Sequence, residues 1–173
     1  MSRLFGIEDA LDSDAWYTPA WVFEGMGIEF DLDVASPAEP PPWIPAKRAF
    51  TVADDGLTMP WVGVVWCNPP YSNPAPWCRK WAEHEPGGCI LLRADLSTSG
   101  IHAALSTSST IYAPAKRLQF VNGSGGPTGS VAFSTVILGR GAVAAAGLHR
   151  LAATTHGITR PLEVAARPSP VWA

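Results

Sequence analysis

The alternation of apolar and polar residues along the chain predicts a series of short helices and strands. An apolar cluster at residues 20–27 predicts a short helix that ends at Gly25 or Gly27. Residues 28–34 alternate apolar and acidic side chains, which predicts a strand. Residues 36–48 are rich in proline and therefore predict a loop, because proline lacks a backbone donor and fixes its φ angle.

The rest of the pattern predicts an α/β fold. Residues 63–67 form a short apolar run between turn signals, as expected of a strand buried on both faces. Other runs predict helices at 76–84, 97–105 and 142–153, and strands at 89–92, 110–112, 118–121 and 131–138. We expect a mostly parallel sheet, because strands and helices alternate. The strands at 118–121 and 131–138 are expected to form an antiparallel hairpin that closes it.

The composition is that of a folded protein. The chain has 173 residues, of which 47% are hydrophobic and 16% are charged, and this excludes a disordered chain. We expect a single domain over residues 1–173, with a core at about 14–140 and an alanine-rich C-terminal extension at 141–173. No apolar run approaches the ~18 residues of a membrane span, and the N-terminus lacks a signal sequence. We therefore expect a cytoplasmic protein with no membrane partner.

The charged residues and cysteines exclude two further classes of protein. Twelve Lys and Arg against 15 Asp and Glu give a net charge of −3, which excludes a uniformly basic nucleic-acid coat but leaves room for a local basic patch. Cys67, Cys78 and Cys89 are odd in number and widely spaced, and the histidines have no metal-ligand spacing. We expect neither a disulfide framework nor a bound metal.

The motif Asn68-Pro69-Pro70-Tyr71 directly follows the buried strand at 63–67. A strand delivers such residues to the carboxyl edge of a sheet, where open α/β folds bind ligands. The Asn68 side-chain oxygen and the Pro69 carbonyl could accept the two hydrogens of a planar amino group such as that of adenine. Tyr71 could stack on the base, a contact of about 1–3 kcal/mol. The nitrogen would then attack a methyl donor by direct displacement, without a covalent enzyme intermediate.

The chain resembles the phage-encoded DNA N6-adenine methyltransferase family over about residues 14–139. The resemblance lies in an ordered set of motifs: W-Y-T-P at 16–19, F-D-L-D-V-A-S at 30–36, D-D-G-L at 54–57, W-x-G-x-x-W-C-N-P-P-Y-S at 61–72 and R-L-Q-F at 117–120. It implies a Rossmann-like methyltransferase fold with S-adenosylmethionine as cofactor. It also implies methyl transfer to the exocyclic amino group of adenine in DNA, with Asn68, Pro69, Pro70 and Tyr71 as the catalytic residues.

The resemblance further implies which residues bind the cofactor. Its methionine end would lie against Trp16, Tyr17, Thr18 and Pro19. Asp31 and Asp33, at the end of the first strand, would bind its amino group and balance its positive charge; on an alternating strand both project to one side together with Glu29. Asp54 and Asp55 would hold the adenosine part. Many methyltransferases carry a glycine-rich turn after the first strand, where this chain has 34–37 as Val-Ala-Ser-Pro.

The DNA partner is predicted from three basic pairs, which are Lys47-Arg48, Arg79-Lys80 and Lys116-Arg117. If they converge in space they form a track for phosphates; scattered solvated charges are the alternative. Other substrates also fit the motif, namely the amino group of cytosine or the side-chain amide of a protein glutamine. A non-enzymatic alternative is an inactive relic that binds nucleic acid. If the chain is phage-encoded, it acts in the host cytoplasm.

Overall fold

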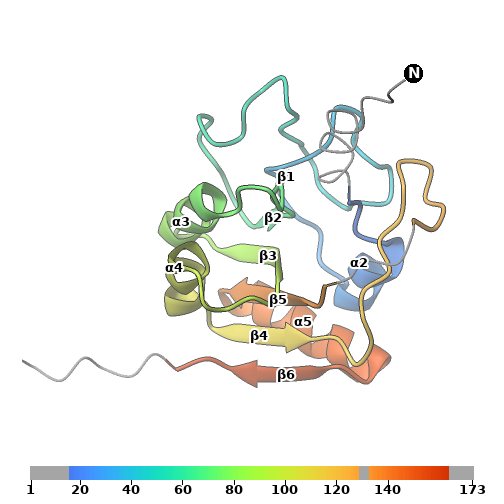
Figure 1. The fold of residues 1–173 in the computed structure, drawn as a ribbon, viewed down its shortest axis with the longest axis vertical. Coiled ribbons are helices and arrows are strands. Elements are labelled where there is room, and N and C mark those ends of the chain that lie inside the picture. Colours follow the sequence, from blue (N-terminus) through green and yellow to red (C-terminus); the bar gives the residue numbers. More distant parts are fainter. Residues whose placement is uncertain (1–15, 129–132, 164–173) are drawn as a thin grey trace, which may run out of the picture.

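The computed structural model describes residues 16–128 and 133–163, and their helices and strands follow most of the predicted pattern (Figure 1). Predicted helices at 20–27, 76–84, 97–105 and 142–153 are found within one or two residues. The elements in chain order are α2 (Ala20–Met26), β1 (Leu32–Asp33), β2 (Val65–Cys67), α3 (Ala75–Glu83), β3 (Gly88–Arg93), α4 (Ser99–Thr107), β4 (Thr110–Ala113), β5 (Thr135–Arg140), α5 (Ala142–Thr155) and β6 (Ile158–Pro161).

The strands form one six-stranded mixed sheet in the order β1-β2-β3-β5-β4-β6. β1, β2 and β3 are parallel neighbours, whereas β5 lies antiparallel between β3 and β4, and β6 is antiparallel to β4. The predicted α/β class is confirmed. The predicted hairpin between 118–121 and 131–138 is wrong, because β5 takes β3 and β4 as partners. Residues 118–120 form no strand, and Val121 makes only isolated bridges to Tyr17 and Pro127.

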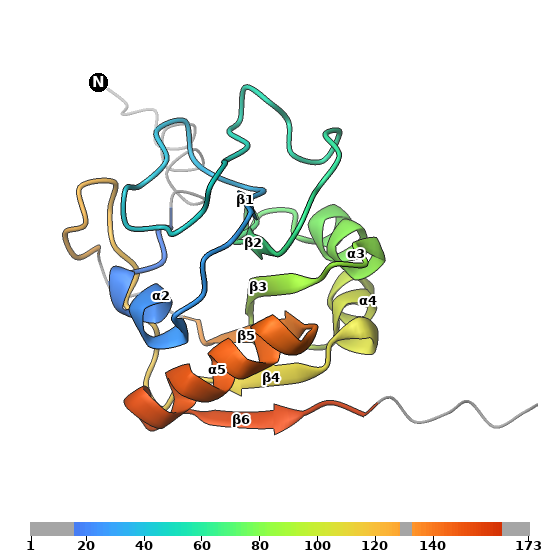
Figure 2. The ribbon, with the colours of Figure 1, turned by 180° about the vertical axis from the view of Figure 1, so that it is seen from behind.

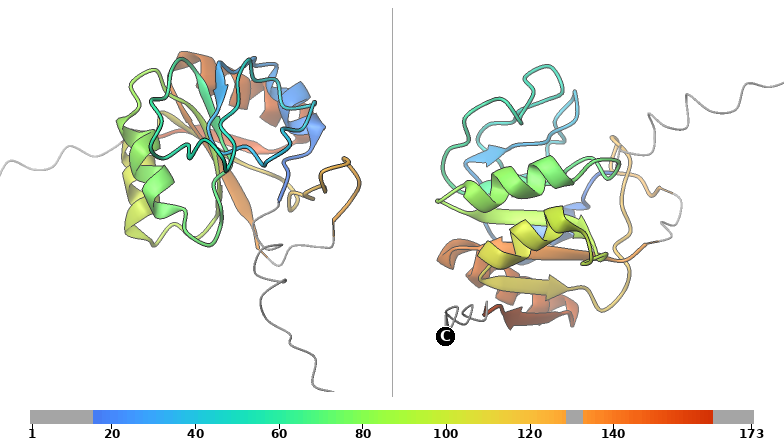
Figure 3. Two further views of the ribbon diagram at one scale, coloured as in Figure 1. Left: turned by 90° about the horizontal axis from the view of Figure 1, so that it is seen from above. Right: turned by 60° about the vertical axis from the view of Figure 1, so that its left-hand side comes forward.

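Helices cover both faces of this sheet in three layers. α3 and α4 lie side by side on one face, and α2 and α5 lie on the other (Figures 1 and 2). The view from above shows the sheet between the two helical layers (Figure 3). β6 is the outermost strand and was not predicted. Its Pro161 is tolerated because an edge strand has a side on which no ladder hydrogen bond is needed.

Two apolar cores result, one on each face of the sheet. Strand residues alternate between them: Trp66, Cys89 and Leu91 pack under α2 and α5, while Val65, Cys67, Ile90 and Leu92 pack under α3 and α4. Because neighbouring strand residues point to opposite faces, a strand buried on both sides must be apolar throughout. This explains the short apolar run predicted as a strand at 63–67. All three cysteines are buried and free.

The proline-rich segment covers the outer edge of β1. Phe30 donates its N–H to the Pro45 carbonyl at 2.7 Å, and Asp33 donates to the Arg48 carbonyl at 2.9 Å. The predicted strand at 28–34 is regular only over Leu32–Asp33, because its outer neighbour contains prolines that cannot complete a ladder. The segment still satisfies the backbone of β1 and thereby fixes the strand that carries Asp33.

Candidate functional site

The site lies where the parallel strands β1 and β2 end. β1 ends at Asp33, and β2 is followed by Asn68 and the rest of its motif. The two strands are in register, with Asp33 opposite Trp66, so their carboxyl ends meet at the same edge of the sheet. α3 then begins within six residues of the motif, with Pro74 as its N-cap.

A pocket of about 250 Å³ opens at this edge. We call it the first pocket. It joins residues from five separate segments of the chain, including four of the eight residues predicted to bind the cofactor. It is lined by Trp16, Tyr17, Thr18, Asp33, Ala35, Ser36, Pro37, Ala38, Ile44, Val52, Trp66, Asn68 and Pro70. Pro19 does not line it; this residue is instead the N-cap of α2.

The segment at residues 16–19 is held over the site by three kinds of contact. Tyr17 exchanges two backbone hydrogen bonds with Val121, at 3.2 and 3.0 Å. The Trp43 indole donates to the Thr18 carbonyl at 2.9 Å. Asn68 donates from Nδ2 to the Trp16 carbonyl at 2.6 Å. The motif predicted to be catalytic and the segment predicted to bind the cofactor are therefore joined directly.

The hydrogen bond to Trp16 also fixes the orientation of the Asn68 amide. A carbonyl oxygen only accepts hydrogen bonds, so the amide nitrogen must face Trp16 and Oδ1 must point the other way. Oδ1 is buried and has no partner among the described residues; the same holds for Thr18 Oγ1 and Trp66 Nε1. Buried polar atoms are nearly always paired in native proteins. Three such atoms on residues of one pocket indicate a polar ligand.

Among the described residues, Asp33 and Tyr17 are the only ionisable residues that line the first pocket. Its side chain is 3% exposed, and burial raises its pKa to about 6, against the opposing effects of the Ala35 N–H and the Ser36 hydroxyl. Across residues 16–128 and 133–163, the two salt bridges join Lys47 to Asp31 and Arg140 to Glu85, so neither supplies Asp33 with a cation. A buried carboxylate without a positive partner is costly, and a cationic ligand would remove that cost.

Asp31, predicted to act together with Asp33, lies outside the pocket. Its Oδ1 accepts from Lys47 Nζ at 2.9 Å and its Oδ2 accepts from the Val64 N–H at 2.8 Å. These two hydrogen bonds lower the pKa of its carboxyl group. The alternation argument fails here because β1 is regular only from Leu32 onward. Asp31 thus ties the start of β1 to the residues before β2.

A second pocket of about 230 Å³ adjoins the first and shares Ala35, Ser36, Val52 and Pro70 with it. Asp55, predicted to hold the adenosine part, lines this second pocket with Gly56 and Trp77. Asp54 does not line either pocket. Its carboxylate accepts from the Thr51 N–H and hydroxyl, at 2.8 and 2.9 Å, and so closes the turn that leads to Asp55.

Tyr71 belongs to an aromatic cluster that sequence reasoning did not predict. Its ring meets Phe133 edge-on at 5.3 Å and Phe120 at 6.0 Å, and Trp16 lies 5.9 Å from Phe120. Arg93 lies over the Phe133 ring at 4.6 Å. The Tyr71 hydroxyl is buried and has no partner among the residues that the structure describes, and burial raises the pKa of the phenol. Phe120 is the last residue of the R-L-Q-F motif, so the sequence did single out one member of this cluster.

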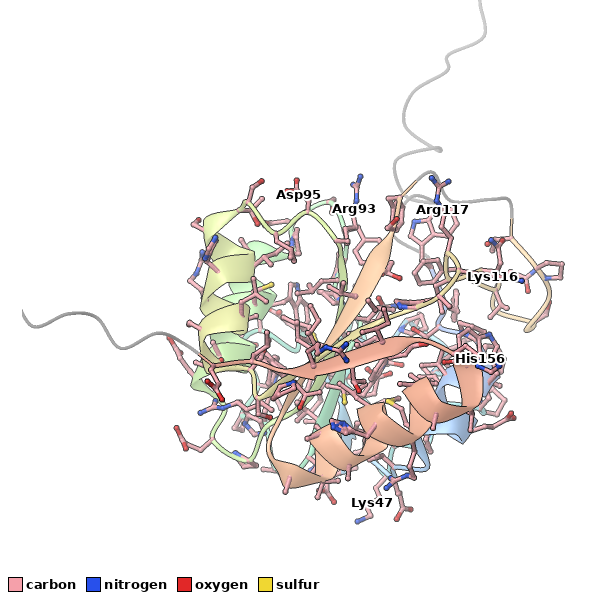
Figure 4. The ribbon with its side chains drawn as sticks, turned by 90° about the horizontal axis from the view of Figure 1, so that it is seen from below. Lys47, Arg93, Asp95, Lys116, Arg117 and His156 are labelled. Carbon is pink, nitrogen blue, oxygen red and sulfur yellow. The ribbon has the colours of Figure 1, made fainter. Side chains whose placement is uncertain are left out.

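The three basic pairs do not form a single track. Lys47 pairs with Asp31, and it lies on the opposite side of the molecule from Arg117 and Arg93 (Figure 4). Arg48 lies over the Phe50 ring at 5.8 Å. Lys80 binds backbone carbonyls, whereas Arg79 on the same helix is exposed. The remaining pair, Lys116 and Arg117, is exposed, and Figure 4 places it on the side of the molecule that carries Arg93.

Two further kinds of site have no support in the described residues. Within residues 16–128 and 133–163, no helix is long and apolar enough to cross a membrane. The same residues contain no group of three or more His, Cys, Asp or Glu side chains placed to hold a metal ion.

The fold and the pockets define an α/β protein with a ligand site at the carboxyl ends of parallel strands. A family model described as DNA N-6-adenine-methyltransferase (Dam) matches residues 8–138. A protein of that name from Haemophilus phage HP1 (strain HP1c1) is 32% identical over 121 residues, which cover 64% of this chain and 68% of the relative. The chain belongs to the DNA N-6-adenine-methyltransferase (Dam) family, and the resemblance predicted from its motifs is confirmed.

Proposed function

We propose that this chain is an adenine-specific DNA methyltransferase that uses S-adenosylmethionine and carries out its chemistry at Asn68. Family membership supports the reaction. One observation carries the placement of the chemistry: Asn68 Oδ1 is buried beside a pocket with a buried carboxylate and has no partner in residues 16–128 and 133–163. The parallel strands β1 to β3, with the pocket at their carboxyl ends, support a Rossmann-like methyltransferase fold.

The cofactor fits the residues of the two joined pockets. Asp33 matches the cationic amino group of its methionine part, since the carboxylate is buried and lacks a positive partner. The Thr18 hydroxyl can donate to or accept from its polar groups, and the Trp66 indole N–H can donate to them. We place the adenosine part in the second pocket, beside Asp55 and the flat ring of Trp77. When bound, S-adenosylmethionine supplies an electrophilic methyl group, which the amino nitrogen takes up by direct displacement.

The motif residues prepare the amino group of adenine for this reaction. The nitrogen is a poor nucleophile while its lone pair is delocalised into the ring. Asn68 Oδ1 and the Pro69 carbonyl accept its two hydrogens and draw it out of the ring plane, and Tyr71 stacks on the base. Neither acceptor binds a proton at neutral pH, so the proton lost from nitrogen passes to water. The cluster of Phe120 and Phe133 holds the Tyr71 ring in place.

The DNA lies, in our proposal, across Arg93, Lys116 and Arg117. Arg93 connects this surface to the reaction site, since it lies over Phe133, which in turn contacts Tyr71. An adenine in a duplex must be flipped out to reach Asn68, at a cost of a few kcal/mol, and phosphate contacts on either side of the flipped base would offset it. We infer that the enzyme acts in the cytoplasm, where its DNA substrate is found.

Replacing Arg117 with alanine should weaken DNA binding uniformly across sequences. Loss of one phosphate contact lowers the slope of log affinity against log salt by about 1. Fluorescence anisotropy with a labelled duplex at several salt concentrations measures this slope. Lys47→Ala is the matched control, because Lys47 is neutralised by Asp31 on the opposite side of the molecule. Equal slopes for Arg117→Ala and the wild type would place the DNA elsewhere.

The pH dependence of cofactor binding tests the role of Asp33. The cation binds the ionised carboxylate, whose pKa in the free protein is about 6. We therefore expect constant affinity above pH 6 and a loss of roughly tenfold per unit below it, since the proton must leave before the cation binds. Calorimetric titration between pH 5 and 8 measures this. Affinity that is independent of pH over that range would contradict the assignment.

The proposed reaction is tested by incubating the protein with DNA and S-adenosylmethionine labelled in its methyl group. After digestion of the DNA to nucleosides, the label is expected in N6-methyldeoxyadenosine. Label in methylated cytosine would mean that cytosine is the substrate instead of adenine. Label on a glutamine of an added protein would mean that the substrate is a protein. Absence of label together with DNA binding would instead support the inactive relic.

A further inference from the structure

Lys80 points into the loop that follows Asp55 rather than toward solvent. This lysine lies in the last turn of α3. Its Nζ contacts the carbonyl oxygens of Gly56 at 3.0 Å, Leu57 at 2.7 Å and Met59 at 2.5 Å. An ammonium group has three hydrogens to donate, so these three acceptors use its whole capacity. Lys80 therefore has no donor left for a DNA phosphate.

Trp61 reinforces the same loop. Its indole N–H donates to the Gly56 carbonyl at 2.7 Å, and its ring lies 5.1 Å from the Lys80 ammonium. The Gly56 carbonyl thus receives two hydrogen bonds, one of them from a charged donor. Trp61 also stacks on Trp77, with ring centroids 6.3 Å apart. Hydrogen bonds to charged groups are stronger than neutral ones, so the loop is fixed chiefly by Lys80.

The fixed loop is a wall of the second pocket. Asp55 and Gly56 line this pocket together with Trp77. Asp55 has a positive φ of 53°, a conformation that is uncommon for a residue with a side chain. Gly56 lies so close to the residue after β1 that an added Cβ would be 2.0 Å from the Val34 carbonyl oxygen. Small movements of the loop would therefore change the shape of the pocket.

We propose that Lys80 is a positioning residue for the cofactor: its ammonium clamps the carbonyls of residues 56, 57 and 59 so that Asp55 and Gly56 form the adenosine end of the site. This inference rests on the proposed function, in which the second pocket receives adenosine. Lys80 does not touch the cofactor itself, and it acts only through the loop. It couples the helix that follows the catalytic motif to the far end of the cofactor site.

Lys80→Met tests this role, because methionine keeps much of the length and removes the three donors. Arg79→Met is the matched control, since it removes one positive charge from an exposed position on the same helix. We expect Lys80→Met to weaken S-adenosylmethionine binding by about tenfold and to leave the KM for DNA unchanged. Arg79→Met should bind the cofactor as the wild type does. Calorimetry gives the affinity, and steady-state kinetics separate the two KM values.

Several outcomes would overturn the proposal. Unchanged cofactor affinity in a folded Lys80→Met protein would do so, as would equal increases in the KM for cofactor and for DNA. If Lys80→Met does not fold, Trp61→Phe decides, because it keeps an aromatic ring beside Lys80 and removes the indole N–H bond to Gly56. Wild-type cofactor affinity in that variant overturns the proposal, and a weaker affinity supports it. A wild-type protein that does not bind S-adenosylmethionine would instead overturn the proposed function.

Discussion

Replacing Asn68 with alanine is expected to lower the rate of methyl transfer by about 10²–10³-fold, the usual cost of losing one positioned hydrogen-bonding group at a reacting centre. Oδ1 is the buried acceptor that the structure leaves without a partner. The variant also loses the hydrogen bond from Nδ2 to Trp16. A neutral hydrogen bond contributes about 1 kcal/mol, so cofactor affinity should fall less than tenfold. Single-turnover measurements with saturating cofactor separate the two effects.

Asn73→Ala serves as the matched control for this experiment. Asn73 lies five residues after Asn68 on the same connection, and its side chain is exposed. Its variant should retain the wild-type rate. A wild-type rate in Asn68→Ala would remove this residue from the chemistry, and equal losses in both variants would mean that the whole connection had been disturbed.

Asp33→Asn is expected to change cofactor affinity and protein stability in opposite directions. The folded protein raises the pKa of this carboxyl from 3.8 to about 6, so the folded state holds the proton more tightly than the unfolded state. Stability is consequently lost as the pH rises from about 4 to 6, and the full cost, about 3 kcal/mol, applies above pH 6. Asparagine carries no charge and avoids this cost. The unliganded variant should therefore be the more stable protein at pH 8.

Cofactor affinity should fall about 100-fold in the same Asp33→Asn variant, because the cation loses its buried counter-charge. Urea denaturation at pH 8 and at pH 4 measures the stability, with the difference between variant and wild type expected only at pH 8. Calorimetry measures the affinity. Asp31→Asn is the control: it removes a carboxylate paired with Lys47 at the surface and should leave cofactor affinity unchanged. Similar affinity in Asp33→Asn and the wild type would move the cofactor away from Asp33.

Local sequence signals predicted the elements that carry the motif. The strand before Asn68 is apolar because both of its faces are buried, and α2 ends at Gly27, whose φ of 57° is one that glycine adopts at little cost. The predicted strand at 118–121 failed because its apolar residues serve the aromatic cluster instead. Leu118 and Phe120 are buried without a sheet partner. An apolar run predicts that a segment is buried more reliably than it predicts which strand, if any, that segment pairs with.

The parts of the candidate site that the sequence pattern did not place depend on contacts between distant segments. Asp31 and Asp33 are equivalent in the sequence pattern, yet only Asp33 faces the pocket. Lys80 was predicted to contact DNA. It instead donates to carbonyls of residues 56–59, and this is possible only because the fold brings that loop next to α3. Likewise, Phe133 reaches Tyr71 from a segment 62 residues further along the chain. Spacing along the sequence carries no information of this kind.

The position of β5 has a consequence for how the chain folds during synthesis. β5 lies between β3 and β4, although it is made after both of them. Until residues 135–140 leave the ribosome, the backbone N–H and C=O groups of β3 and β4 that later pair with β5 are without those partners. Open edges invite pairing with other chains. α2, α3 and α4 precede β5 in the chain and α5 follows it, and the sheet becomes continuous only when β5 enters its centre. The slowest step of folding should accordingly be the pairing of β5 with both β3 and β4 in the centre of the sheet, rather than growth from one edge.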